Sequence, residues 1–250
     1  MDGIIIVDKP QGWTSFDVCA KIRNLSGTRK VGHSGTLDPM ATGVLAIFLG
    51  KATKSIQQFL DGDKGYLAEV TLGSKTDTGD ATGKKIITND ELRIPNEGEI
   101  RELLKKYTGE IEQTPPMYSA VKINGQRLYK LARQGIEVER KPRKITIYDL
   151  RMTHYDSQDL PAGRQGPTDQ YFTPLVHCSK GTYIRQLATD IGDDLGCGAH
   201  LSALQRTFSQ PFHISQALSM ETIINLAKIG KLDSVVIPVE DILNHENSNR

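Results

Sequence analysis

The feature that most constrains the fold is the irregular succession of strand-like and helix-like segments along the 250 residues. The apolar stretch 42–50 is typical of a buried strand, and YLAEVTLG (66–73) alternates with the period of two of a half-buried strand. Helical spacing recurs at 97–109 and at 182–196. Because these segments follow no regular βαβ rhythm, the sequence predicts an α+β fold with a mixed, largely antiparallel central sheet flanked by helices.

A further helix is predicted over about 15–25, directly after a Lys-Pro-Gln-Gly turn. A hydroxyl residue of the Thr-Ser pair before it can cap its first turn. Its apolar positions Phe16, Val18 and Ile22 fit the buried face of a helix only roughly.

The composition is that of an ordinary water-soluble chain, with 38% hydrophobic and 24% charged residues. The longest purely apolar run, VLAIFL (44–49), is far too short to span a bilayer, and the N-terminus lacks the basic segment of a signal peptide. Three cysteines lie far apart without CxxC spacing, and the six histidines show no metal-ligand spacing. We therefore expect a cytoplasmic protein with reduced thiols, no metal and no membrane association.

Basic residues are concentrated between positions 121 and 151. This window holds nine Lys or Arg against three acidic residues, a net charge of +6, whereas the whole chain carries +1 and the remainder therefore −5. Localised positive charge on a mildly acidic body is typical of an arm that binds a polyanion. The alternative is a solvated charged face without a ligand.

One carboxylate has an unusually constrained setting, in HSGTLDPMATGVL (33–45). Pro39 disfavours the right-handed helical conformation for Asp38 and supplies no backbone N–H, so that Asp38 is predicted to lie on a rigid turn. Such a carboxylate can be a nucleophile, an acid or base, a metal ligand or a turn former. These four roles stay open on the motif alone.

Arg185 is a candidate for a functional cation. It falls in the first turn of the helix predicted at 182–196, for which we expect Thr182 as the N-cap and Gly196 just beyond the C-terminus. The helix dipole disfavours positive charge at this end, which predicts an anionic partner for Arg185. The alternative is an arginine that points into solvent.

The sequence resembles the TruB family of bacterial tRNA pseudouridine-55 synthases over roughly residues 4–245. Besides the Asp38 motif, the resemblance rests on VDKPQGWTS, FLDGDKGYLAEVTLGSKTDTGDATG, PPMYSAVKINGQRLYKLARQG, CSKGTYIRQLATDIG and GAHLSALQRT. It implies the pseudouridine synthase fold as a single catalytic domain, 1–250, with a thumb-like RNA-binding insertion at about 121–151. Many members carry a further C-terminal RNA-binding domain, and we expect none in this chain.

The resemblance also implies the reaction and its central residues. Such enzymes isomerise the uridine at position 55, in the T loop of tRNA, to pseudouridine without a cofactor. Asp38 matches the essential nucleophilic aspartate, and Arg185 is expected to orient it, with Asp80 as a further partner of the guanidinium. Tyr66 is expected to lie against the target base and to accept a proton.

Further residues are expected to contact the flipped nucleotide. Tyr183 resembles the second tyrosine that contacts the base, and Leu204 the apolar or backbone contact to the uracil. His33 matches a histidine that fills the vacated space or contacts the flipped nucleotide. In an unrelated protein, Tyr66 would be interpreted as packing and His33 as a structural histidine.

The basic window is expected to act as the thumb on the T arm of tRNA. Its candidate RNA-binding residues are Arg127, Lys130, Arg133, Arg140, Lys141, Arg143 and Lys144. A monomer is the default expectation. Two other functions remain open: a guide-RNA-dependent pseudouridine synthase subunit, and a non-catalytic tRNA-binding or folding factor. The loop at 156–170 matches no family pattern and is assigned no function.

Overall fold

The computed structural model describes residues 1–86, 93, 95–156 and 170–248, which form two compact units. Unit 1 comprises Met1–Tyr66 and Leu204–Arg250, and unit 2 comprises Leu67–Ala203. The unit boundary falls within two long strands, β4 (Lys64–Leu72) and β12 (Ala199–Ser209), which therefore contribute residues to both units.

Unit 1 is built on a sheet with the strand order β14-β1-β3-β12, in which β2 also pairs with β3 and β13 with β12. Its strands are β1 (Gly3–Lys9), β2 (Val31–His33), β3 (Thr42–Leu49), β13 (Phe212–His213) and β14 (Leu218–Ser219). β1 and β3 are antiparallel, whereas β14 runs parallel to β1, and the end of β12 runs parallel to β3.

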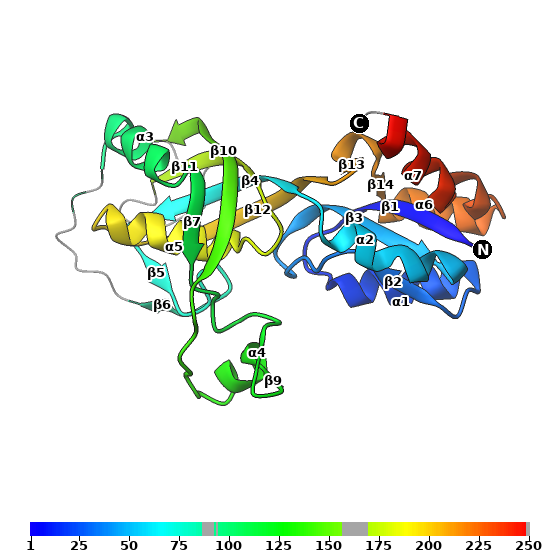
Figure 1. The fold of residues 1–250 in the computed structure, drawn as a ribbon, viewed down its shortest axis with the longest axis horizontal. Coiled ribbons are helices and arrows are strands. Elements are labelled where there is room, and N and C mark those ends of the chain that lie inside the picture. Colours follow the sequence, from blue (N-terminus) through cyan, green and yellow to red (C-terminus); the bar gives the residue numbers. More distant parts are fainter. Residues whose placement is uncertain (87–92, 94, 157–169, 249–250) are drawn as a thin grey trace. The chain divides into compact units, whose positions relative to one another are not determined.

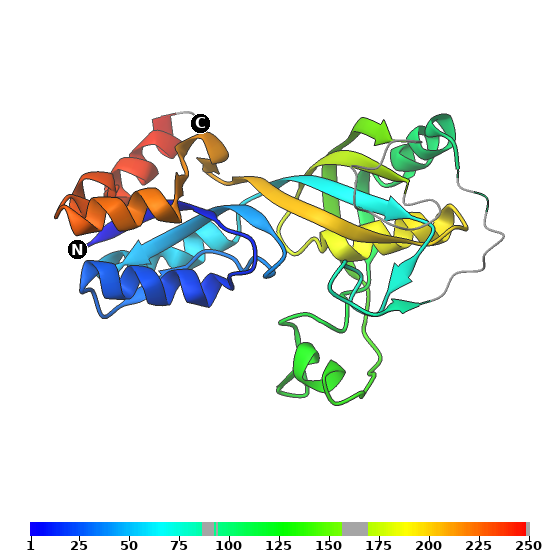
Figure 2. The ribbon, with the colours of Figure 1, turned by 180° about the vertical axis from the view of Figure 1, so that it is seen from behind.

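Helices cover both faces of this sheet. Successive β1 side chains point to opposite faces, so that Ile5 and Val7 pack with α1 (Ser15–Ser26) and α6 (Met220–Lys228). Ile4 and Ile6 pack on the other side with α2 (Ile56–Leu60) and α7 (Val239–Ser248), as comparison of Figures 1 and 2 shows. The core of unit 1 therefore has two layers, one on each side of β1 and β3.

The first turn of α1 is tightly held. Thr14 accepts a hydrogen bond from the Asp17 N–H, and the Asp17 carboxylate accepts one from the Thr14 N–H, which completes a capping box. The helix ends at Gly27, whose φ of 64° is left-handed. The predicted apolar face is correct for Val18 and Ile22 but wrong for Phe16, which is 72% exposed because it lies off the core face of the helix.

Unit 2 contains a sheet with the order β12-β4-β11-β10-β7. Its strands β7 (Gly109–Gln113), β10 (Arg143–Asp156) and β11 (Tyr171–Cys178) form antiparallel pairs with β10 at the centre. Two helices, α3 (Glu97–Lys106) and α5 (Ile184–Asp194), pack against each other, and α3 also contacts β10. A short ladder joins β5 (Lys75–Thr76) to β6 (Lys85–Ile86).

The chain between β7 and β10 forms a separate excursion of unit 2. It contains β8 (Lys122–Ile123), β9 (Gln126–Arg127) and α4 (Leu128–Ala132), and Figure 1 shows α4 and β9 standing away from the β7 and β10 strands. Leu128 and Leu131 are buried inside it. β8, β9 and α4 lie within the predicted thumb segment, 121–151, whose residues from Arg143 onward belong instead to β10 of the sheet.

The predicted fold class is confirmed, since the described residues form a mixed, largely antiparallel sheet with helices on its faces. The single-domain organisation stays a prediction. Positions 157–169 of the unassigned loop lie outside the described residues. Among the helices that are described, none is long and apolar enough to cross a bilayer.

Candidate functional site

Asp38 lies on the turn between β2 and β3, in unit 1, and the residues around it are tied to α1. The Ser15 hydroxyl accepts from the Leu37 N–H at 2.9 Å and donates to the Leu37 carbonyl at 3.3 Å, with both side chains buried. On the other side of Asp38, the Gly12 N–H donates to the Pro39 carbonyl at 2.7 Å. The half-buried carboxylate therefore projects from a backbone held at both neighbours.

Lys9 is a fully buried cation beneath this turn. Its ammonium donates to the carbonyls of Trp13 at 2.6 Å and Pro10 at 2.9 Å, and reaches the Pro39 carbonyl at 3.4 Å. Burial lowers the pKa of Lys9 to about 8, while the Asp38 carboxylate acts in the opposite direction. Lys9 is not among the site residues predicted from the sequence. The sequence feature that could have indicated it is the Lys-Pro pair between an apolar strand and a capped helix.

Arg206, on β12, is a second buried cation that is absent from the predicted site residues. Its guanidinium donates to the carbonyls of Val44 at 2.8 Å and Gly35 at 3.2 Å, and its side chain is hydrogen-bonded to Tyr66. Gly43 has φ of 101°, and a side chain there would overlap the Arg206 backbone, so only glycine permits this approach. Arg206 thus connects the Asp38 loop with Tyr66 inside unit 1.

His33 ends β2, at the start of the same loop. Its ring lies perpendicular to the Phe16 ring, with 5.7 Å between centroids. Its Nδ1 atom is buried and has no hydrogen-bond partner among the described residues. Burial lowers the pKa of His33, while the Gly35 backbone acts in the opposite direction.

Leu204 begins the part of β12 that belongs to unit 1. Its side chain is buried, and its carbonyl accepts a hydrogen bond from the Thr42 hydroxyl at 3.4 Å. Unit 1 therefore holds Asp38, Tyr66, His33 and Leu204 among the predicted site residues.

Arg185 belongs to unit 2, in the first turn of α5, and is buried. It donates to the carbonyls of Tyr118 at 2.8 Å and Thr78 at 2.9 Å, and its Nε lies 3.7 Å from an Asp80 carboxylate oxygen. Asp80 is also buried and accepts hydrogen bonds from Thr82 and Thr78. The structure thus brings together Arg185 and Asp80, whereas the predicted pairing of Arg185 with Asp38 joins residues of different units and stays a prediction.

The N-terminus of α5 differs from the predicted one. Tyr183 occupies the N-cap position, and Thr182 instead donates its hydroxyl to the Ser179 carbonyl, which closes the loop before the helix. The Tyr183 backbone is held on both sides by the Gln113 amide, at 2.8 Å and 3.1 Å. Gly196 follows the C-cap with φ of 75°, as predicted.

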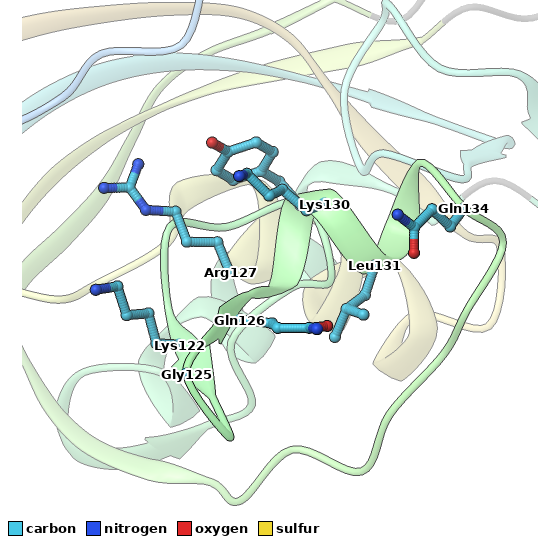
Figure 3. Close-up of a pocket in the computed structure, with 8 residues that line it drawn as sticks. Lys122, Gly125, Gln126, Arg127, Lys130, Leu131 and Gln134 are labelled. Atoms are coloured by element: carbon cyan, nitrogen blue, oxygen red, sulfur yellow. The ribbon is translucent and has the colours of Figure 1, made fainter.

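The thumb segment carries a basic hollow of about 500 Å³ (Figure 3). Its lining residues are Lys122, Gly125, Gln126, Arg127, Tyr129, Lys130, Leu131 and Gln134. Arg127 and Lys130, both predicted to bind RNA, therefore lie in one hollow. Arg133 lies over the Tyr129 ring, 5.5 Å from its centroid.

The remaining four predicted RNA-binding residues fall into two groups. Arg140 is paired with Glu137 at 3.0 Å and Lys144 with Glu110 at 2.8 Å. Lys141 and Arg143 are exposed. No cluster of three or more His, Cys, Asp or Glu side chains that could hold a metal ion occurs in the part of the chain that the structure describes.

Comparison with protein families gives two adjacent matches. Residues 23–184 match the model of the TruB family pseudouridylate synthase N-terminal domain, and residues 185–244 match that of the tRNA pseudouridylate synthase B C-terminal domain. The boundary between the two matches lies inside the first turn of α5, directly before Arg185.

Curated relatives are similar over the whole chain. A tRNA pseudouridine synthase B of Geobacillus thermodenitrificans is 48% identical over 98% of this chain and 79% of its own length. The protein of the same name from Syntrophotalea carbinolica is 48% identical over 100% of this chain and 77% of its own. The structure is also similar to a chain of a Cbf5-Nop10-Gar1 complex, with a TM-score of 0.71 and 29% identity, over 97% of this chain and 62% of that one.

Proposed function

The chain belongs to the TruB family of pseudouridylate synthases, and we propose that it isomerises the uridine at position 55, in the T loop of tRNA, to pseudouridine. The observation that carries the proposal is the Asp38 turn. Hydrogen bonds with Ser15 and Gly12 hold the backbone on either side of the carboxylate, and the buried Lys9 lies beneath it. This is the preorganisation that a single nucleophile needs.

The reaction conserves all atoms of the nucleotide. The bond from C1′ to N1 breaks, the base rotates, and a bond from C1′ to C5 forms, while C5 loses a proton and N1 gains one. No oxidant, reductant or external group is consumed, so the chemistry itself needs no cofactor. Asp38 serves as the nucleophile, by attack on the sugar or the base, and Tyr66 serves as the acceptor of the C5 proton.

Preorganised charge supports these two roles from within unit 1. Lys9 is close enough to Asp38 for their charges to influence each other, and Arg206 is hydrogen-bonded to Tyr66. A fixed cation stabilises negative charge on a neighbouring oxygen, and it does so without reorganising during the reaction. Lys9 is therefore a positioning residue for Asp38, and Arg206 for Tyr66.

The base must leave the RNA stack to reach Asp38, which costs a few kcal/mol. Aromatic and apolar contacts offset that cost at about 1–3 kcal/mol for each stacked base. We propose that Tyr66, Tyr183 and Leu204 contact the flipped base. His33 fills the space that the base leaves or contacts the flipped nucleotide. Arg185, held with Asp80, serves to orient Asp38.

We further infer that the enzyme acts as a monomer in the cytoplasm and that its thumb segment contacts the T arm. The basic hollow with Arg127 and Lys130, together with the exposed Lys141 and Arg143, supports the contact with phosphates. All three cysteines are buried thiols, which fits a reducing compartment.

The test is pseudouridine mapping of a T-arm transcript with the unchanged chain and with Asp38→Asn. We expect complete loss of product in the variant while RNA binding is largely kept, because Asn preserves the shape but not the nucleophile. Asp233→Asn, an exposed acid on the same unit, is the matched control and should keep full activity. Product formation by Asp38→Asn at a comparable rate would refute the proposal.

A guide-RNA-dependent activity is the second candidate, favoured by the similarity to a chain of a Cbf5-Nop10-Gar1 complex. The same assay separates the two functions. Activity of the purified chain on a free T-arm transcript supports the first, and activity only after guide components are added supports the second. Binding without product under both conditions would instead indicate a non-catalytic tRNA-binding or folding factor.

A further inference from the structure

We propose that Phe16 is a further substrate-binding residue, whose exposed ring stacks on a base of the bound RNA next to His33. Nothing in the resemblance to the TruB family assigns a role to this position. The proposal rests on the proposed function, because it takes the RNA of that reaction as the ligand. It concerns unit 1 alone, to which both side chains belong.

The first observation is that Phe16 contributes little to the core. It is 72% exposed, more than any other large hydrophobic residue that the structure describes; the next is Ile229 at 65%. The buried residues of α1 are Ser15, Val18, Cys19 and Ile22. A polar side chain at position 16 would therefore serve the fold equally well.

The second observation is that the backbone on both sides of Phe16 is held in place. It lies between Ser15, which is hydrogen-bonded to Leu37 beside the nucleophile, and Asp17, which closes the capping box of α1. The backbone that carries the ring is thus tied to the same turn that carries Asp38. Because the backbone is already fixed, only the side-chain torsions of the ring are left to be ordered when a ligand stacks on it, which limits the entropy lost.

The third observation is the pairing with His33. The two rings are perpendicular, with centroids 5.7 Å apart, and the buried His33 Nδ1 has no hydrogen-bond partner among the described residues. An unpartnered buried polar atom costs free energy unless a ligand completes it. The exposed Phe16 ring therefore lies beside a histidine with an unfilled hydrogen-bonding position, and an aromatic ring is a contact on which an unstacked nucleobase can stack.

The surroundings favour a base over an apolar protein partner. The exposed residues that follow Phe16 along α1 include Asp17, Ala20 and Arg23, of which only the small Ala20 is apolar. A single ring among polar side chains is poorly suited to a protein interface, which needs a larger apolar centre. It is well suited to a base, because every base has a π face.

The test measures RNA binding in the Asp38→Asn background, where no turnover interferes, for Phe16→Ala, Phe16→Leu and Phe16→Trp. We expect Phe16→Ala and Phe16→Leu to weaken binding about tenfold to hundredfold. Phe16→Trp should bind RNA as tightly as the chain with Phe16, because stacking requires a π face and not merely an apolar surface. The slope of log Kd against log salt should stay unchanged, since every phosphate contact is kept. Ile229→Ala, a similarly exposed apolar residue on the same unit, is the control.

A second readout reports stacking directly. A T-arm transcript with 2-aminopurine beside the target uridine should lose fluorescence when it binds to the unchanged chain or to Phe16→Trp. The loss of fluorescence should be smaller with Phe16→Leu. In the otherwise unchanged enzyme, Phe16→Leu should raise KM more than it lowers kcat. Equal affinity and equal quenching for Phe16 and Phe16→Leu would overturn this inference, whereas failure of the proposed function would show as absence of product from the unchanged chain.

Discussion

At the scale of single residues, two buried cations organise the neighbourhood of the proposed nucleophile. Lys9 holds three carbonyls around the Asp38 turn, and Arg206 holds two carbonyls and the side chain of Tyr66. Both lie on strands that flank β3, and neither touches solvent appreciably. A buried charge is retained only where hydrogen bonds and opposite charges compensate its desolvation.

Lys9 gives a pH prediction whose sign follows from its lowered pKa. The unfolded chain binds the proton of Lys9 more tightly than the folded chain, because the pKa is 10.5 in the unfolded chain and about 8 in the folded one. Below pH 8 the buried charge therefore lowers the free energy of unfolding. This loss of stability disappears as the pH rises from 8 to 10.5. The free energy of unfolding of the unchanged chain minus that of Lys9→Met should therefore rise by up to about 3 kcal/mol across the window. Urea unfolding followed by Trp13, the single tryptophan, measures it. Parallel pH profiles for the two chains would contradict the expectation.

Asp80 gives a second residue-level prediction. Asp80→Asn removes a buried negative charge 3.7 Å from the Arg185 guanidinium, and we expect a loss of about 3 kcal/mol in the free energy of unfolding, because a buried charge is left with less compensation. Asp77→Asn, an exposed acid in the same turn, should cost less than about 1 kcal/mol. Thermal or urea unfolding compares the two variants, and equal effects would show that the buried pair contributes nothing particular.

At the scale of elements, the part of the thumb segment before β10 forms an excursion from the sheet of unit 2. Its buried residues include Leu128 and Leu131, and it carries the basic hollow of Figure 3. Ion pairs already compensate Arg140 and the exposed Lys144, whereas Lys141 and Arg143 are exposed and form no ion pair with the residues that the structure describes. Lys141 and Arg143 should therefore contribute more to RNA binding.

Charge reversal tests this division. Lys141→Glu with Arg143→Glu should weaken RNA binding and reduce the slope of log Kd against log salt by about 0.7–0.9 for each phosphate that is no longer neutralised. Reversal of the ion-paired Arg140 and Lys144 should have a smaller effect, because each has a carboxylate beside it before RNA arrives. Lys228→Glu, on α6, is the control outside the thumb. Binding isotherms over a series of KCl concentrations measure the slope for each variant. An unchanged slope in Lys141→Glu with Arg143→Glu would exclude these two residues as phosphate contacts.

At the scale of the whole molecule, charge and site residues are divided between two units. The window 121–151, with its net charge of +6, belongs to unit 2 together with Arg185, Asp80 and Tyr183. Unit 1 supplies Asp38, Tyr66, His33 and Leu204. The chain passes between the units inside β4 and β12, so the residues on either side of the boundary, among them Tyr66 and Leu204, are held by strands that serve both.

Signals that neighbouring residues carry were enough to predict several of the strands and helices, the Asp38 turn and the family. Periodicity predicted strands and helices, Pro39 predicted a turn at Asp38, and the motifs predicted the TruB family, because each of these signals is contained within a short stretch of chain. The helix caps were less accessible from the sequence: Thr182 was expected to cap α5, and Tyr183 occupies that position instead.

Which side chains are buried together became evident only from the folded chain. Lys9 would be interpreted as part of a turn, and Arg206 as one of many surface cations, until β12 pairs with β3 and brings Arg206 against Gly35 and Val44. Phe16 would be placed in the core until the direction of α1 turns it outward beside His33. Burial of Arg206 depends on contacts with residues 162 and 171 positions away, and exposure of Phe16 depends on the orientation of a whole helix, so no local pattern encodes either.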